Sequence, residues 1–310
     1  MQNVRNLWID SDTASDDAVA ILMALRSEVV NVLGISIVSG NVDQKQGAVN
    51  ARYTVQLCEK DTPVYIGSGK PFIRPVKHAT SFHGDDGMGN MHYSVPEINE
   101  NRNGVLAMID TIKAHKNNVD LVTLGPLTNV ALALMLEPEI TEWVSQCYIM
   151  GGAACTVGNT TPAAEYNIWC DPEAASVVFN SGLPILMVGW EHCRGENAIV
   201  ADDITKIKEI NTVYGQFLLD CNRSLLENFI IKYGDPGIPL PDPITMAIAI
   251  NRSVCAESSS CFVDISLDKE LTRGMTVVDQ LKVTQNPPNV EVCWTIDTFL
   301  WKQVLFDSLN

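Results

Sequence analysis

The stretch NLWIDSDTASDDAVAILMALR, residues 6–26, sets the fold class of this chain. It opens with a short apolar strand, residues 6–10, that ends in an acidic residue. A helix rich in Ala, Leu and Met is predicted to follow over residues 16–26. A strand that passes through a short polar turn into a helix is the unit from which α/β folds are built.

The same alternation continues outward along the chain. Further strands are expected at 29–38, 64–67, 120–124, 146–150 and 183–188, and helices at 45–60, at 129–136 and from Asp171 onward, with Pro172 in the first turn. Residues 202–251 are largely helical with a Gly/Pro-rich break at 234–243, and strands at 261–265, 275–278 and 290–295 precede a last helix at 298–309. The pattern predicts an α/β fold with a mainly parallel central sheet flanked by helices. With no repeat and no linker, residues 1–310 are expected to form a single domain.

Composition excludes several classes of protein. The formal charge is −16, a field that repels polyanions, so no nucleic-acid partner is expected. No apolar run approaches the ~20 residues that span a bilayer, and no membrane association is expected. The nine cysteines form no CxxC pair and indicate reduced thiols. Without a signal-peptide pattern at its start, the chain is expected to be cytoplasmic.

Polar or glycine-rich clusters lie where several of the expected strands end, at 10–17, 40–41, 125–128 and 151–152. In open α/β sheets, ligands bind outside the carboxyl ends of the strands. One active site formed by four loops at that edge is therefore predicted.

The first of these clusters contains four aspartates, Asp10, Asp12, Asp16 and Asp17. Asp16 and Asp17 at a helix N-terminus could simply offset the helix dipole, by about 0.3–1 kcal/mol each. That explanation leaves Asp10 and Asp12 unexplained, whereas a hard divalent cation such as Ca²⁺ or Mg²⁺ takes oxygen ligands from aspartate. A phosphohydrolase is disfavoured because no phosphate-binding loop accompanies the acidic cluster.

The segment from Ile9 to Ile21 resembles the N-terminal signature of the inosine–uridine nucleoside hydrolases. Six further motifs keep the order of that family, from residue 40 to about residue 245. They are GNV at 40–42, HGDDGMG at 83–89, LGPLTNVA at 124–131, the loop from MGG at 150–152 through GN at 158–159 to AEYNI at 164–168, DPEAA at 171–175 and PDP at 241–243.

The resemblance implies an enzyme that hydrolyses the N-glycosidic bond of ribonucleosides to ribose and a free base. It also implies a tightly bound Ca²⁺ and a homodimer or homotetramer. The metal ligands that it implies are Asp12, Asp17, Asp242 and the backbone carbonyl of Thr128, with Asp12 also acting as the general base for a metal-bound water. The residues that it implies for the ribose are Asp16 on the 2′-hydroxyl, Asn41 and Asn167 on the hydroxyls near the metal, and Asn159 and Glu165 at the 5′-hydroxyl.

Physical chemistry agrees with these roles, because cleavage of an N-glycoside develops positive charge on the ribose, which carboxylates and amide oxygens stabilise. Each residue also has an ordinary local explanation. Asn41 and Asn159 follow glycines, as turn residues do. Glu165 alone would be a surface acid, and Thr128 is a candidate N-cap, which is compatible with a carbonyl that binds metal.

The chain departs from the usual family pattern at Pro241, where many members carry the histidine held to protonate the leaving base. It resembles the subgroup that lacks this histidine. His83 is the best candidate acid by its place in the motif, with Cys155 as a second choice; Trp190 and His192 are candidates for the edge of the site. Two alternatives stay open, a nucleoside-binding protein that has lost catalysis and a hydrolase of another N-riboside. The motifs specify the ribose end of a ligand and leave its base open.

Overall fold

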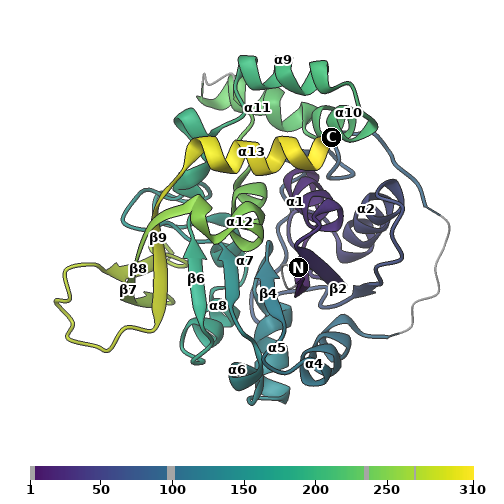
Figure 1. Ribbon diagram of the computed structural model, residues 1–310. Helices are drawn as coiled ribbons and strands as arrows, with labels where there is room; N and C mark the ends of the chain where they lie inside the picture. Colours follow the sequence, from purple (N-terminus) through teal and green to yellow (C-terminus); the bar gives the residue numbers. More distant parts are fainter. Residues whose placement is uncertain (1–3, 96–101, 234–236, 269) are drawn as a thin grey trace.

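The computed structural model describes residues 4–95, 102–233, 237–268 and 270–310. The strands of these residues form one sheet, in the order β3-β2-β1-β4-β5-β6-β9-β7-β8 (Figure 1). Their bounds are β1 (Arg5–Ser11), β2 (Val30–Ile37), β3 (Val64–Ile66), β4 (Asp120–Thr123), β5 (Cys147–Met150), β6 (Ile185–Val188), β7 (Cys255–Ile265), β8 (Thr276–Asp279) and β9 (Val290–Ile296). The pairs from β3 to β9 are parallel and only β7 and β8 join antiparallel, so the predicted mainly parallel sheet is confirmed.

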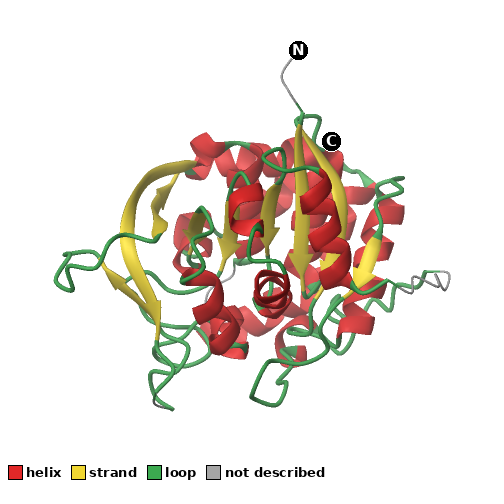
Figure 2. Ribbon diagram, turned by 90° about the horizontal axis from the view of Figure 1, so that it is seen from below, coloured by secondary structure: helices red, strands yellow, loops and turns green. Residues whose placement is uncertain are grey.

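Helices cover both faces of this sheet (Figure 2). The helices of the described residues are α1 (Ser15–Arg26), α2 (Gln44–Leu57), α3 (Thr80–His83), α4 (Gly104–Ala114), α5 (Thr128–Leu136), α6 (Ile140–Trp143), α7 (Tyr166–Cys170), α8 (Pro172–Phe179), α9 (Ala201–Ile210), α10 (Val213–Cys221), α11 (Arg223–Tyr233), α12 (Pro241–Ile250) and α13 (Thr298–Leu309). In the part of the chain that the structure describes, no helix is long and apolar enough to cross a bilayer.

The hydrophobic core lies in two layers, one on each face of the sheet. Successive residues of a strand point to opposite faces, so Leu7 and Ile9 of β1 enter one layer and Trp8 enters the other. The first layer is built with α1, α2, α10, α12 and α13, and the second with α4, α5, α6 and α8. Continuous apolar strands are expected in this arrangement because both faces are buried.

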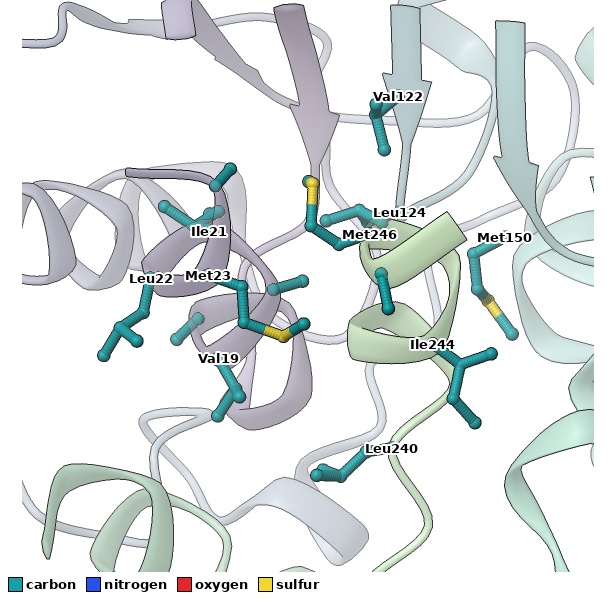
Figure 3. Close-up of a cluster of buried hydrophobic side chains, with 14 of the residues drawn as sticks. Val19, Ile21, Leu22, Met23, Val122, Leu124, Met150, Leu240, Ile244 and Met246 are labelled. Carbon is teal, nitrogen blue, oxygen red and sulfur yellow. The ribbon is translucent and has the colours of Figure 1, made fainter. Parts of the chain in front are cut away.

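Helix α12 packs against α1 beneath the ends of the central strands (Figure 3). Met246 and Ile244 of α12 belong to the same buried cluster as Leu22 of α1 and Leu124, which follows β4. This packing places the first turns of α1 and α12 side by side, although they are far apart in the sequence. It therefore decides which polar side chains meet at the site.

The order in which the chain adds strands to the sheet reverses between β1 and β4, which are neighbours in it. From β1 the chain moves outward to β2 and β3 on one side, and from β4 to β5 and β6 on the other. Such a switch point leaves a crevice between the loops that follow the two strands. The loops here are 12–14, after β1, and 124–127, after β4.

Candidate active site

A pocket of about 360 Å³ opens beyond this switch point. Three of the predicted residues, Asp12, Asp17 and Thr128, are buried at or near zero exposure and are not among the residues that line it. Seven further predicted residues contribute to its lining: Asp16, Asn41, His83, Asn159, Glu165, Asn167 and Asp242. The structure thus gathers residues from position 16 to position 242 around one cavity.

Three carboxylates meet at the adjoining first turns of α1 and α12. Oxygen atoms of Asp16, Asp17 and Asp242 lie within 4.8 Å of one another, and all three side chains are buried. Asp17 also caps its own helix, since Oδ2 accepts a hydrogen bond of 3.0 Å from the Ala14 amide. The compact cluster therefore contains Asp16 together with two of the expected metal ligands, Asp17 and Asp242.

Asp12 lies beside this cluster in a close-fitting backbone cradle. Its Oδ2 accepts a 2.5 Å hydrogen bond from the Asn41 amide, while Oδ1 has no hydrogen-bond partner among the described residues. A Cβ added to Gly40 would lie 2.0 Å from Oδ2, and one on Gly125 would lie 2.8 Å from Oδ1. Both loops carry glycine because the aspartate fills the space that any side chain would take.

The electrostatics of the cluster call for a cation. Burial, together with the neighbouring charge of Asp17, raises the pKa of Asp12 well above its ordinary value, and burial with the charge of Asp16 does the same for Asp242. Burial raises the pKa of Asp16 and of Asp17 to about 6. Desolvated carboxylates this close together are costly unless an opposite charge is shared among them.

The donor atoms present fit a hard divalent cation. Oδ1 of Asp12 and Oδ1 of Asp16 are buried without a hydrogen-bond partner among the described residues. Buried polar atoms are normally paired, and oxygen ligands of this kind suit Ca²⁺. The cluster can therefore hold a metal ion.

Asp10, the remaining aspartate of the acidic stretch, has a structural role. Its Oδ2 accepts hydrogen bonds from the Ser36 hydroxyl on β2 and, at 2.9 Å, from the Asn129 side chain on α5. Burial raises its pKa to about 7. Asp10 thus ties β1 to β2 and to the helix that follows β4.

The interpretation of Thr128 as an N-cap is wrong. Leu127 is the cap residue of α5, and Thr128 is the first residue of the helix. The Thr128 hydroxyl instead donates a 2.6 Å hydrogen bond to Oδ2 of Asp171, which also accepts from the Phe72 amide. The helix begins one residue earlier than a Thr128 cap requires, and the Thr128 hydroxyl forms a charge-assisted hydrogen bond to the buried Asp171 carboxylate.

Two residues at the expected sugar end are held firmly by the backbone. Glu165 caps α7 and accepts hydrogen bonds from the amides of Gly152, Asn167 and Ile168 at 2.8–3.2 Å, and burial raises its pKa to about 7. The interpretation of Glu165 as a surface acid is therefore wrong. The Asn167 side-chain nitrogen donates to the carbonyls of Leu124 and Met150, which leaves its oxygen for the pocket.

His83, Trp190 and Pro241 also line the pocket. Burial lowers the pKa of His83 to about 4, so its imidazole is neutral at neutral pH. His192 lies outside the lining, because its Nε2 is hydrogen-bonded to the Cys293 carbonyl at 3.1 Å. Cys155 is exposed and is also absent from the lining residues.

Sequence reasoning missed a group of pocket residues from the loop before α3 and from α7. Nζ of Lys77 lies 5.3 Å from the centre of the Trp169 ring. The backbone carbonyl of Lys77 accepts a 2.8 Å hydrogen bond from the Tyr166 hydroxyl. His78 shares a 2.8 Å hydrogen bond with the Gly40 carbonyl. Tyr166 and Trp169 flank Asn167 in the sequence, and that adjacency was the available signal.

Comparison with known proteins gives a consistent result. Residues 7–302 match the family model described as inosine-uridine preferring nucleoside hydrolase. A pyrimidine-specific ribonucleoside hydrolase of Shewanella sp. strain MR-4 is 37% identical over 312 residues, covering 98% of this chain and 96% of the relative. A plant nucleoside hydrolase superposes with a TM-score of 0.93 at 29% identity, and a purine-preferring ribonucleoside hydrolase from Gardnerella vaginalis with 0.91 at 27%, each covering 98% of both chains.

The fold and the site together define an α/β protein with a carboxylate-rich small-molecule site at the carboxyl edge of its sheet. The chain belongs to the inosine–uridine preferring nucleoside hydrolase family. It is accordingly an enzyme, an N-glycosyl hydrolase.

Proposed function

We propose that this protein hydrolyses the N-glycosidic bond of ribonucleosides to ribose and a free base, with Ca²⁺ as its cofactor. The observation that carries the proposal is the buried Asp16–Asp17–Asp242 cluster at a pocket lined by amide and acid side chains. Such a surface suits a ligand rich in hydroxyl groups, because each group can donate to an acidic or amide oxygen. The family relationship supplies the bond that is cleaved.

Asp12, Asp17, Asp242 and the backbone carbonyl of Thr128 would hold the metal. When bound, Ca²⁺ would orient a water molecule and lower its pKa. Because Ca²⁺ does this weakly, a carboxylate base is still required. The unpartnered Oδ1 of Asp12 is suited to accept that proton, since Oδ2 is already occupied by the Asn41 amide.

Attack of the water oxygen on the anomeric carbon breaks the bond to the base nitrogen. Asp12 takes a proton from the water, and the departing base takes up one proton as it leaves. Asp16 would bind the 2′-hydroxyl, with Asn41 and Asn167 on the neighbouring hydroxyls. Asn159 and Glu165 would bind the 5′-hydroxyl end. Their oxygens stabilise the positive charge that develops on the ribose.

Departure of the base calls for a donor, and Pro241 stands where many members of the family carry one. A proline ring has no side-chain proton to give, so Pro241 cannot serve. His83 lines the same pocket as Pro241 and is the proposed donor. Its neutral imidazole carries one N–H, which can donate a hydrogen bond to a carbonyl or ring nitrogen of the leaving base as negative charge develops there. The proton that the base finally keeps equals the one that Asp12 takes from the water, exchanged through solvent, so the ring does not become an imidazolate.

Replacing His83 by alanine should lower kcat for a natural ribonucleoside by about 10²–10⁴-fold, the usual contribution of a general acid. The same change should hardly affect p-nitrophenyl riboside, whose leaving group departs without protonation. Steady-state kinetics on both substrates distinguishes a residue that assists departure of the base from one that binds the ribose. Equal losses on the two substrates would assign His83 to ribose binding, and no loss on either would remove it from the reaction.

A panel of purine and pyrimidine ribonucleosides, assayed for release of reducing sugar with and without a chelator, tests the proposed function as a whole. We expect turnover that is lost with the chelator and restored by Ca²⁺. Nucleoside binding without release of sugar would identify a binding protein instead. Release of sugar only from other N-ribosides would move the activity to that substrate class.

We also propose that residues 1–310 act as one domain and that the protein assembles as a homodimer or homotetramer. All strands of the described residues join one sheet, which supports the single domain. The oligomeric state is expected from the family, and light scattering of the purified protein would measure it.

A further inference from the structure

Ser15, which none of the roles above uses, contacts the proposed proton donor directly. The Ser15 hydroxyl lies 2.8 Å from Nδ1 of His83, and both side chains are buried. Ser15 is the first residue of α1, and His83 is the last residue of α3, 68 positions further along the chain. The contact therefore depends on the tertiary fold and not on a local turn.

A buried hydroxyl must give its proton to an acceptor. Among the described residues, the only hydrogen-bond partner of the Ser15 hydroxyl is Nδ1 of His83. If Nδ1 carried the imidazole proton, it would donate to Ser15, and the serine proton would be left without an acceptor. The satisfied arrangement has the hydroxyl donating to a bare Nδ1, which places the imidazole proton on Nε2.

A second group competes for the same nitrogen. Oδ1 of Asp16 lies 3.7 Å from Nδ1 of His83 and has no hydrogen-bond partner among the described residues. A carboxylate in that position favours a proton on Nδ1, because an N–H facing an anionic oxygen forms a strong hydrogen bond. Ser15 and Asp16 thus favour opposite tautomers of one ring.

We propose that Ser15 is a positioning residue that holds His83 in the tautomer with its proton on Nε2. This inference rests on the proposed role of His83 as donor to the leaving base. Nδ1 is engaged with α1, so Nε2 is the nitrogen left for the pocket that His83 lines. With the proton on Nε2 the ring can donate to the base, whereas the other tautomer would offer only a lone pair.

The tautomer can be read directly by NMR in the full chain with Ca²⁺ present. The sequence holds five histidines, so ¹⁵N-histidine labelling gives few ring signals, and His83→Gln assigns those of His83. Long-range ¹H–¹⁵N correlations should show a bare Nδ1 and a protonated Nε2. A proton on Nδ1 in the unmodified protein would overturn the proposal without the need for any variant.

Ser15→Ala provides the second arm of the test. Without the hydroxyl, the His83 proton should move to Nδ1 and face Asp16, and kcat for a ribonucleoside should fall by at least about tenfold, part of a general acid's usual 10²–10⁴-fold. The loss on p-nitrophenyl riboside should be much smaller. Ser15→Thr keeps a hydroxyl and should restore the Nε2 tautomer and most of the rate.

Ser39→Ala is the matched control, because Ser39 is also buried and its hydroxyl has no partner among the described residues. It should leave the His83 signals unchanged. An unchanged tautomer in Ser15→Ala would overturn the role of Ser15. If the tautomers behave as expected but His83→Ala keeps full activity, the placement by Ser15 stands and the donor role of His83 fails.

Discussion

Asp17→Asn should yield a protein without bound Ca²⁺ and with kcat lowered by about 10³-fold. The metal ion supplies several kcal/mol of stabilisation to the transition state, and each 1.36 kcal/mol is tenfold in rate. Asp17 shares the cluster with Asp16 and Asp242, and an amide in its place removes a charge from the proposed cation site. Elemental analysis of the purified variant and steady-state kinetics measure the two losses.

Asp203→Asn separates loss of metal from loss of a negative charge at a helix N-terminus. Asp203 occupies the same third position in α9 as Asp17 does in α1, and each accepts a 3.0 Å hydrogen bond from the amide that precedes its helix. The asparagine oxygen can still accept that hydrogen bond, but the charge at the helix N-terminus, worth about 0.3–1 kcal/mol, is lost, and in Asp203→Asn the ion pair with Lys302 is lost as well. Asp203→Asn should therefore destabilise the protein yet keep metal and activity. Full calcium and full turnover in Asp17→Asn would show that its carboxylate is only a cap.

2′-Deoxyribonucleosides should be very poor substrates, with kcat/KM lowered by up to about 10⁴–10⁵-fold relative to the ribonucleosides. Asp16 is buried, its Oδ1 has no hydrogen-bond partner among the described residues, and it is the proposed partner of the 2′-hydroxyl. A substrate without that hydroxyl leaves a buried carboxylate oxygen unpaired, which is more costly than losing a neutral contact.

Measuring kcat/KM for one ribonucleoside and for its 2′-deoxy and 5′-deoxy forms tests this assignment. Asp16→Ala should reduce activity on the ribonucleoside and nearly abolish the discrimination against the 2′-deoxy form. Discrimination against the 5′-deoxy form should persist in that variant, because Asn159 and Glu165 are expected to bind the 5′ end. Equal kcat/KM for the ribonucleoside and its 2′-deoxy form would exclude Asp16 as a source of specificity.

The architecture could be predicted because parallel strands buried on both faces appear in a sequence as apolar runs that end in polar loops. Strand β7 was predicted only from residue 261, whereas it begins at Cys255. Most side chains over 256–260 are exposed, so that part shows no apolar run. No element was predicted over α4, although Asn103 caps it in the ordinary way.

The acidic cluster of the site could be predicted because aspartates that lie between an apolar strand and an apolar helix stand out in a sequence. The surroundings of Glu165 were not predictable, since its partners are backbone amides that only the folded loop brings together. The pocket is also lined by Lys77, Trp169 and Trp190, but a lysine in a sequence ordinarily indicates surface and a tryptophan ordinarily indicates packing. Aromatic rings carry no signature of a site until the fold places them around a cavity.

The meeting of α1 and α12 would make a cation bound there a crosslink between distant parts of the chain. A metal held by Asp17 and Asp242 joins residues 242 − 17 = 225 positions apart. A tie that closes so long a loop restrains the unfolded chain more than a local one does. Calcium should therefore lengthen the lifetime of the folded enzyme as well as assist its chemistry. Protease digestion should be faster with a chelator present, and Asp17→Asn should be digested at the chelated rate whether or not Ca²⁺ is added.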